Sequence, residues 1–126
     1  MPILQVQALP QSSPDKIQPA LKATCAAIAK VYGCKIEQVW ATWNEIKPDL
    51  YIEGLSAAKT QPESSHPPIA QLICFEGKSS EEIENLLSVA ASTLSENLGI
   101  SKNIFITYHE AMSGRVIAGN EIVRRK

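Results

Sequence analysis

The chain has 126 residues, of which twelve are lysine or arginine and thirteen are aspartate or glutamate, so its formal net charge is −1. This length is typical of one compact domain with its own hydrophobic core. Basic residues are neither in excess nor gathered in a long run, so nucleic acid and membrane surfaces are not expected as partners. The sequence also has no apolar stretch of about 18–20 residues and no signal peptide, which predicts a cytoplasmic protein.

Three cysteines, Cys25, Cys34 and Cys74, show no C-x-x-C spacing and have no histidine nearby in the sequence. An odd number at these spacings argues against a disulfide framework or a metal site. Cys25 and Cys74 lie in apolar patterns, so we interpret them as buried free thiols.

Residues 2–9 are predominantly apolar and precede a segment rich in turn-forming residues, which predicts a strand followed by a loop. An amphipathic helix is predicted next, because apolar residues recur at spacings of three and four and Gly33 follows as a stop. The stripe consists of Ile17, Leu21, Cys25, Ile28 and Tyr32. The helix start is open between Ser13-Pro14 and Pro19, since a proline in a helix interior costs about 3 kcal/mol.

Residues 38–46 are rich in aromatic side chains and precede a Pro-Asp turn, which predicts a second strand. Strand alternation places Trp40, Thr42 and Asn44 on one face. The other face carries Val39, Ala41, Trp43 and Glu45.

Residues 55–67 contain few apolar side chains and many turn formers, which is typical of a linker. The pattern of the first half then returns. A strand is predicted at 68–75, a helix that starts with a capping box at 79–82 and ends at Gly99, and a strand at 103–110.

The two halves are related by a nearly constant offset. Pro2-Ile-Leu-Gln-Val returns 66 positions later as Pro68-Ile-Ala-Gln-Leu, and Gly99 follows Gly33 by the same 66 positions. Each half reads as a β-α-β unit with parallel strands. We therefore predict one α+β domain over 1–126, with repeats at about 1–54 and 68–126, a four-stranded sheet and two helices on one face.

Two helices cover only one face of such a sheet, although the strands carry apolar or aromatic side chains on both faces. Trp40, Trp43, Phe105 and Tyr108 are examples. Association of subunits through the open face is the simplest way to cover it, which favours a homo-oligomer. A ferredoxin-like ligand- or RNA-binding module shares the β-α-β plan, but basic residues around the strand aromatics are lacking.

Pro2 differs chemically from its counterpart Pro68. Removal of Met1 would make the nitrogen of Pro2 a secondary amine, whereas the nitrogen of Pro68 is an amide. An α-amine has an ordinary pKa of about 7.7–8.0, and burial lowers that pKa, which suits a general base near neutral pH. The alternative interpretation is a proline that merely begins an edge strand.

The order of these segments resembles 4-oxalocrotonate tautomerase (4-OT). Residues 68–82, Pro-Ile-Ala-Gln-Leu-Ile-Cys-Phe-Glu-Gly-Lys-Ser-Ser-Glu-Glu, resemble its N-terminal segment, and Met112-Ser-Gly-Arg-Val-Ile-Ala-Gly continues the likeness after Glu110. A chain of two such units is similar to the fused members of the tautomerase superfamily, such as cis-3-chloroacrylic acid dehalogenase and malonate semialdehyde decarboxylase. The resemblance implies the fold shared by the tautomerases and macrophage migration inhibitory factor (the tautomerase/MIF-like fold), a homotrimer, and catalysis by Pro2 without metal or cofactor.

The resemblance also points to substrate-binding residues. The family's arginines, which hold a substrate carboxylate bidentately, fall on Lys78, Phe75, Phe105 and Trp40. A pocket phenylalanine of the single-unit enzyme falls on Tyr51. These changes imply a more apolar pocket, suited to the enol of an aryl or alkyl α-keto acid.

Other polar side chains have two interpretations each. Lys78 either binds substrate or caps a loop, and Arg115 either reaches a carboxylate from its Ser-Gly-Arg turn or is solvated. His109 is either a proton donor or a core or interface histidine. We expect His66 in the linker to be solvated, and the basic tail at 124–126 to be disordered or packed on a neighbouring subunit.

The predicted function is a cofactor-independent keto–enol tautomerase that acts on a small-molecule carboxylate or keto–enol substrate with Pro2 as general base. Two alternatives remain open. One is a non-catalytic trimeric relative that has lost its substrate arginines, and the other is a hydratase, dehalogenase or decarboxylase of the same superfamily.

Overall fold

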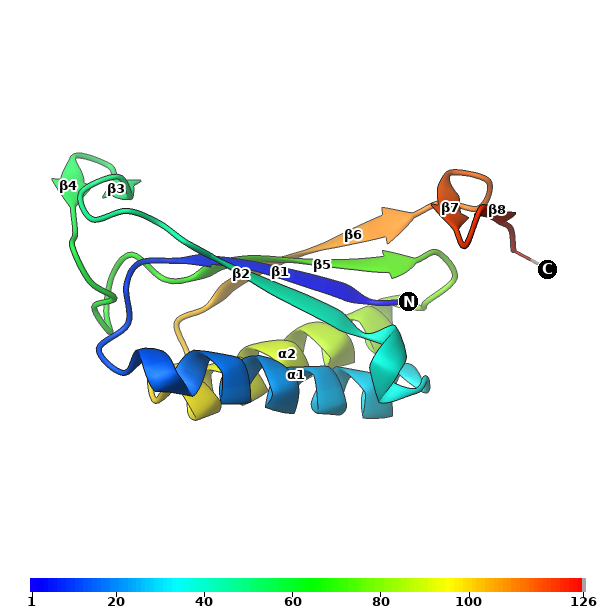
Figure 1. The fold of residues 1–126 in the computed structure, drawn as a ribbon, viewed down its shortest axis with the longest axis horizontal. Helices are drawn as coiled ribbons and strands as arrows, with labels where there is room; N and C mark the ends of the chain where they lie inside the picture. The colour runs from blue at the N-terminus through cyan, green and yellow to red at the C-terminus, as the bar shows by residue number, and fades with distance from the viewer. Residues whose placement is uncertain (126) are drawn as a thin grey trace.

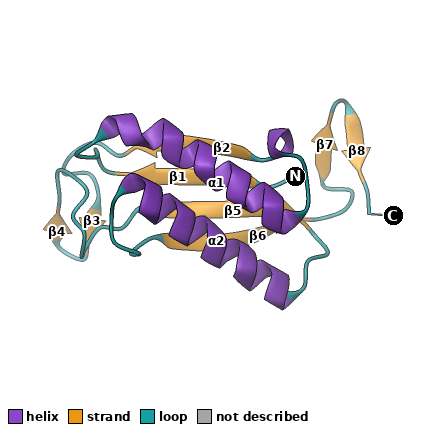
Figure 2. Ribbon diagram, turned by 90° about the horizontal axis from the view of Figure 1, so that it is seen from below, coloured by secondary structure: helices purple, strands orange, loops and turns teal. Residues whose placement is uncertain are grey.

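Four long strands form one mixed sheet, and two helices cover one of its faces (Figure 1 and Figure 2). The computed structural model describes residues 1–125. The sheet has the order β2-β1-β5-β6. Its elements are β1 (Ile3–Ala8), β2 (Trp40–Glu45), β5 (Ile69–Phe75) and β6 (Phe105–Ala111), with helices α1 (Ile17–Tyr32) and α2 (Ser80–Leu98). This arrangement confirms the predicted α+β fold.

The strand pairing shows how the two halves join. Strand β1 pairs with β2 in parallel, and β5 pairs with β6 in parallel. The halves meet where β1 and β5 run antiparallel in the middle of the sheet. The same hydrogen bond recurs in both halves: Trp40 N donates to Pro2 O at 3.0 Å, and Phe105 N donates to Pro68 O at 3.0 Å. The repeat seen in the sequence is therefore also a repeat of backbone geometry.

Helix α1 begins later than Pro14 and earlier than Pro19. A single 3-10 turn, η1 (Pro14–Lys16), precedes it, and the α-helix starts at Ile17. Pro19 consequently lies in the first helical turn, where its missing N–H has no intrahelical acceptor to lose. The helix ends at Gly33, which adopts the left-handed conformation with φ of 85° and donates its N–H to Ala29 O.

Helix α2 begins with the predicted capping box. Glu82 N donates to Ser79 Oγ at 3.1 Å, and Ser79 N donates in return to Glu82 Oε1 at 3.1 Å. These bonds hold the pKa of the Glu82 carboxyl below its ordinary value. Like α1, the helix ends at a left-handed glycine, Gly99.

The core lies between the helices and the covered face of the sheet. Its largest fully buried side chains include Leu4, Val6, Ile28, Leu72, Leu86 and Leu94. Cys74 is buried among them, as predicted, whereas Cys25 is only half-buried because it lies beside an open groove described below. Burial raises the pKa of both thiols, so they stay protonated at neutral pH.

Two short hairpins, one at each end of the sheet, were not predicted (Figure 2). They are β3 (Ile52–Glu53) with β4 (Ser56–Ala57), and β7 (Val116–Ala118) with β8 (Glu121–Val123). The first hairpin spans the expected start of the linker, so that part of the linker is ordered. The prediction that His66 is solvated is wrong: it is 2% exposed, and its Nε2 lies 2.9 Å from Ser56 O.

The sheet face opposite the helices is open between the hairpins (Figure 1). Its middle row crosses all four strands in register and is polar throughout. The row consists of Thr42, Gln5, Gln71 and Thr107. Large apolar side chains flank it, with Trp40 53% and Phe105 56% exposed. None of the helices within residues 1–125 combines the length and the apolar character that crossing a bilayer requires.

Candidate functional site

A cavity of about 410 Å³ lies at the end of the sheet where the chain begins. Strand β1 starts here, and β5 and β6 end here. The cavity is lined by Met1, Ile3, Tyr32, Ile73, Phe75, Ala111, Arg115, Val116 and Val123. Pro2 is fully buried between the two lining residues Met1 and Ile3. The start of the chain thus forms part of the wall of a mostly apolar cavity, which we call the Pro2 cavity.

Arg115 is the cationic side chain among the described residues that line this cavity. It stands in the turn after β6, where its N–H donates to Met112 O at 2.9 Å. The structure therefore brings Phe75 and Arg115, two residues named from the sequence, to the same cavity as the start of the chain. Whether they bind a substrate stays a prediction.

The hairpin β7–β8 closes one side of the cavity and is tied to the sheet by polar contacts. Arg125 Nη1 lies 3.6 Å from Glu76 Oε1, and Arg125 N donates to Ser113 Oγ at 2.7 Å. The tail was expected to be disordered or to pack on a neighbouring subunit, but Arg125 packs on its own chain. Lys126 lies outside the described residues.

Lys78 does not line the cavity. Its Nζ donates to Tyr32 O at 3.2 Å, lies 4.2 Å from the centre of the Tyr32 ring and is 3.6 Å from Glu82 Oε2. These contacts link the start of α2 to the end of α1. These contacts do not place Lys78 at the cavity, and its substrate role remains a prediction.

Tyr51 and Phe105 lie at the opposite end of the sheet. They share a second cavity of about 290 Å³ with Ile52, Glu53, Pro67 and Ile69. There the Tyr51 hydroxyl donates to Pro67 O at 2.6 Å. Within one chain, these two side chains are therefore remote from Pro2.

Trp40 and His109 lie on the open face at the Pro2 end, in one row across the sheet with Ile3 and Ile73. His109 Nε2 lies 2.8 Å from Thr107 Oγ1, and both side chains are accessible in the single chain. Neither Trp40 nor His109 lines the cavity. The proposed proton-donor role of His109 remains a prediction.

Tyr32 is a cavity residue that the sequence analysis treated only as part of the helical stripe. It is the last residue of α1, and its hydroxyl accepts a hydrogen bond from the ammonium group of Met1 at 3.5 Å. Burial raises the pKa of Tyr32, and Cys74 and Cys34 raise it further. Its position at the end of the stripe, next to the stop signal Gly33, could have placed it beside the start of β1.

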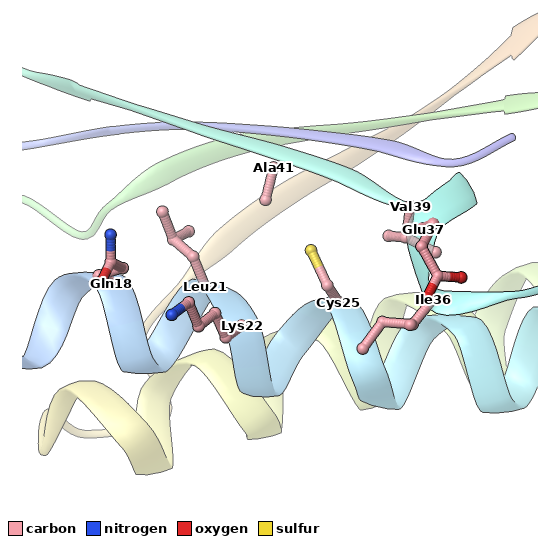
Figure 3. Close-up of a pocket in the computed structure, with 8 residues that line it drawn as sticks. All are labelled: Gln18, Leu21, Lys22, Cys25, Ile36, Glu37, Val39 and Ala41. Atoms are coloured by element: carbon pink, nitrogen blue, oxygen red, sulfur yellow. The ribbon is translucent and has the colours of Figure 1, made fainter.

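A further cavity, of about 470 Å³, lies between α1 and the edge strand β2 (Figure 3). Helix α1 contributes Gln18, Leu21, Lys22 and Cys25. The segment before β2 contributes Ile36, Glu37 and Val39, and β2 itself contributes Ala41. Its walls are largely apolar, and none of these side chains pairs a nucleophile with a base. In residues 1–125, no three potential ligands among His, Cys, Asp and Glu come together as a metal site would need. The Pro2 cavity is therefore the stronger candidate.

Solved structures share this fold over nearly its whole length. The structure of Pt0534 inactivated by 2-oxo-3-pentynoate superposes with a TM-score of 0.82 at 15% identity, covering 96% of this chain and 94% of that one. A native fused 4-OT gives 0.82 at 15% identity, covering 95% and 94%. Malonate semialdehyde decarboxylase gives 0.72 at 17% identity, covering 93% and 90%. No protein-family model matches the sequence, and no curated protein matches it.

These likenesses establish that the chain has the tautomerase/MIF-like fold, as the sequence predicted. More particularly, it has the fused form of that fold, with two β-α-β units in one chain, because it covers almost all of the fused 4-OT chain.

Proposed function

We propose that this protein is a cofactor-independent tautomerase in which Pro2, exposed as an N-terminal amine after removal of Met1, is the general base. The observation that carries the proposal is the burial of Pro2 at the start of a central strand, beside a largely apolar cavity that contains one arginine. Burial disfavours the charged form of an amine and so lowers its pKa toward neutrality. A neutral secondary amine is then available to accept a proton.

The substrate class follows from the cavity. Arg115 supplies a guanidinium that can pair with a carboxylate, and the apolar wall that includes Phe75 suits an aryl or alkyl group. An enol of an α-keto acid combines these features with a proton that can move between oxygen and carbon. The fold neighbours support this class of chemistry, since they include fused 4-OT proteins and Pt0534, which 2-oxo-3-pentynoate inactivates.

We further propose that the protein acts as a homotrimer. Structurally similar fused 4-OT proteins form symmetric and asymmetric trimers, and the open sheet face here carries exposed apolar side chains on either side of its polar row. In such an assembly the far end of one chain, with Tyr51 and Phe105, can approach the Pro2 cavity of another. Light scattering during size-exclusion chromatography measures the mass directly, and a monomer would contradict this proposal.

The test compares two forms of the same protein, one that begins with Pro2, verified by intact mass, and one that retains Met1. Only the form with the free amine is expected to ketonise phenylenolpyruvate and to be covalently labelled at Pro2 by 2-oxo-3-pentynoate. Equal rates in the two forms would remove Pro2 from the mechanism. Absence of turnover and of labelling in both would favour the non-catalytic relative.

A further inference from the structure

The Tyr32 hydroxyl lies next to the position that a substrate oxygen would occupy if Pro2 is the base. The carbonyl carbon of Met1 is bonded to the nitrogen of Pro2, and the ammonium group of Met1 donates to the Tyr32 hydroxyl. The backbone of Met1 therefore forms a path of three atoms (carbonyl carbon, α-carbon and nitrogen) between the Pro2 nitrogen and that hydroxyl. Removal of Met1 leaves this space to a substrate.

The Tyr32 ring is held in place from both halves of the chain. On its own side it ends α1, where Gly33 turns the backbone away in the left-handed conformation. From the second half, Lys78 Nζ lies 4.2 Å from the ring centre and binds the Tyr32 carbonyl oxygen at 3.2 Å. A cation over an aromatic face at this distance is attractive, and here it also fixes the ring plane. Tyr32 is thus pre-positioned before any substrate enters.

The hydroxyl remains a hydrogen-bond donor at neutral pH. The titratable groups close to Tyr32 are the N-terminal ammonium, Lys78, Cys34, Cys74 and Tyr108. Burial and the two cysteines raise the pKa of Tyr32. A protonated phenol in an apolar cavity can donate to an oxygen that becomes negatively charged, but it does not remove protons itself.

We propose that Tyr32 is a catalytic residue that donates a hydrogen bond to the enolate oxygen of the substrate, an assignment that rests on the proposed tautomerase function. In ketonisation, Pro2 takes the proton from the enol O–H and leaves an enolate, whose oxygen accepts the Tyr32 O–H. The carbonyl π bond forms as the electron pair of the C=C bond takes up the proton from the Pro2 ammonium at carbon. One proton passes from oxygen to nitrogen to carbon, and the Tyr32 proton stays in place.

The same geometry explains how the chain can do without the family's other arginines. A carbon that faces the Pro2 nitrogen, the adjacent carbonyl carbon and its oxygen form a three-atom path like that of the Met1 backbone. Arg115 on the same cavity wall is then left for the carboxylate of a 2-keto acid. The negative charge on the enolate and the charge on the carboxylate would each have a separate donor.

The test is Tyr32→Phe in protein that begins with Pro2, because this change keeps the ring under Lys78 and removes only the hydroxyl. We expect kcat for phenylenolpyruvate to fall roughly 10²-fold with KM changed less than threefold, since loss of one oxyanion donor costs about 10²–10³ in kcat. Tyr108→Phe is the matched control, because it removes the same phenol hydroxyl from a tyrosine that does not line the cavity. It should leave kcat unchanged.

A second measurement separates this assignment from the proposed function. Oxalate resembles a pyruvate enolate, and its affinity can be measured by calorimetry whether or not the protein turns over the chosen enol. Wild type is expected to bind oxalate about 10-fold more tightly than Tyr32→Phe, at equal thermal stability. Loss of turnover in the form that begins with Pro2 would count against the tautomerase function alone. Equal oxalate affinities, or no binding to either protein, would overturn the role of Tyr32.

Discussion

The two ends of the sheet share the same arrangement of strands, but they differ in their side chains and in how the chain enters them. At one end the cavity is lined by Met1 and Ile3, and at the other by their counterparts Pro67 and Ile69, 66 positions later. Each end is also flanked by a short hairpin, β7–β8 or β3–β4. The two β-α-β units therefore carry pockets at corresponding positions, and the first of these pockets contains the beginning of the chain.

What differs is how the chain enters each pocket. At the Pro68 end the linker arrives from outside and is anchored as it passes. Tyr51 donates to Pro67 O, the ring of His66 packs edge-on against Tyr51, and His66 N donates to Glu53 Oε2 at 2.9 Å. The charged wall residues also differ, with Arg115 at the first end and Glu53 at the second. At the Pro68 end, the segment that connects the two units therefore has a structural role.

The strongest way to separate the two ends is to replace the two prolines one at a time. Pro2→Ala is expected to lower kcat/KM for phenylenolpyruvate about 10²-fold or more, because the positioned secondary amine is lost. Pro68→Ala should leave kcat/KM within about twofold, because its nitrogen is an amide remote from the cavity. A comparable loss in both variants would mean that the prolines act through the fold.

Truncation of a core side chain should have the same effect in both halves where β1 pairs with β5. Leu4 and Leu72 are register partners on β1 and β5, and both are fully buried. Leu4→Ala and Leu72→Ala are each expected to lower the free energy of unfolding by about 2–5 kcal/mol, through lost burial and the cavity left behind. Urea denaturation gives the comparison. A difference of several kcal/mol between the two variants would show that one half dominates the core.

The anchoring of the linker can be weakened at one atom. Tyr51→Phe removes the donor to Pro67 O and should lower the free energy of unfolding by about 1–2 kcal/mol, because a partly buried carbonyl loses its partner. Tyr108→Phe serves as the control. Within the described chain, the Tyr108 hydroxyl has no oxygen or nitrogen partner, so its removal should cost less than about 0.5 kcal/mol. Equal losses would show that the bond to Pro67 contributes nothing specific.

The smallest effects of substitution are expected at the helix starts. Ser79→Ala should lower the free energy of unfolding by about 1 kcal/mol, because it removes the N-cap of α2. Ser13→Ala should change it by only a few tenths, since the Ser13 side chain caps nothing among residues 1–125. Thermal unfolding of both variants tests this, and a larger loss at Ser13 would reverse the assignment.

The capping box also predicts a pH dependence. Because the pKa of Glu82 is lowered in the folded state, its contribution to stability is fully present above its ordinary pKa of 4.5. That contribution is lost as the pH falls through the folded-state pKa. The stability gap between wild type and Ser79→Ala should therefore narrow in acid, and a gap that widens below pH 4.5 would contradict this account.

Much of the fold follows from local pattern. The helical stripes, the two glycine stops and the Ser79–Glu82 capping box each lie within one short segment of the sequence, and the 66-residue offset indicates the repeat. The hairpins β3–β4 and β7–β8 escaped prediction because strands of two or three mostly exposed residues have no clear alternation. The sequence contained no signal strong enough to define them.

The site was less predictable because its contacts join distant parts of the chain. Lys78 meets Tyr32 across 46 residues, and the burial of His66 depends on a strand and hairpin that only the fold brings together. Strand alternation alone can indicate the face of the sheet on which Phe105 lies, but not the end of the sheet. The sequence repeat does indicate the end, because Phe105 corresponds to Trp40. Phe105 N donates to Pro68 O just as Trp40 N donates to Pro2 O.

The position of β1 in the sheet also bears on when Met1 can be removed. This strand is made first, yet one of its two neighbours, β5, begins 66 residues later. Once β2 and β5 have paired with it, Met1 is held at a cavity wall with its ammonium group on Tyr32. A peptidase that needs an extended chain end therefore has its best access during synthesis, before the sheet closes. For the function proposed above, Met1 would therefore have to be removed before the sheet closes.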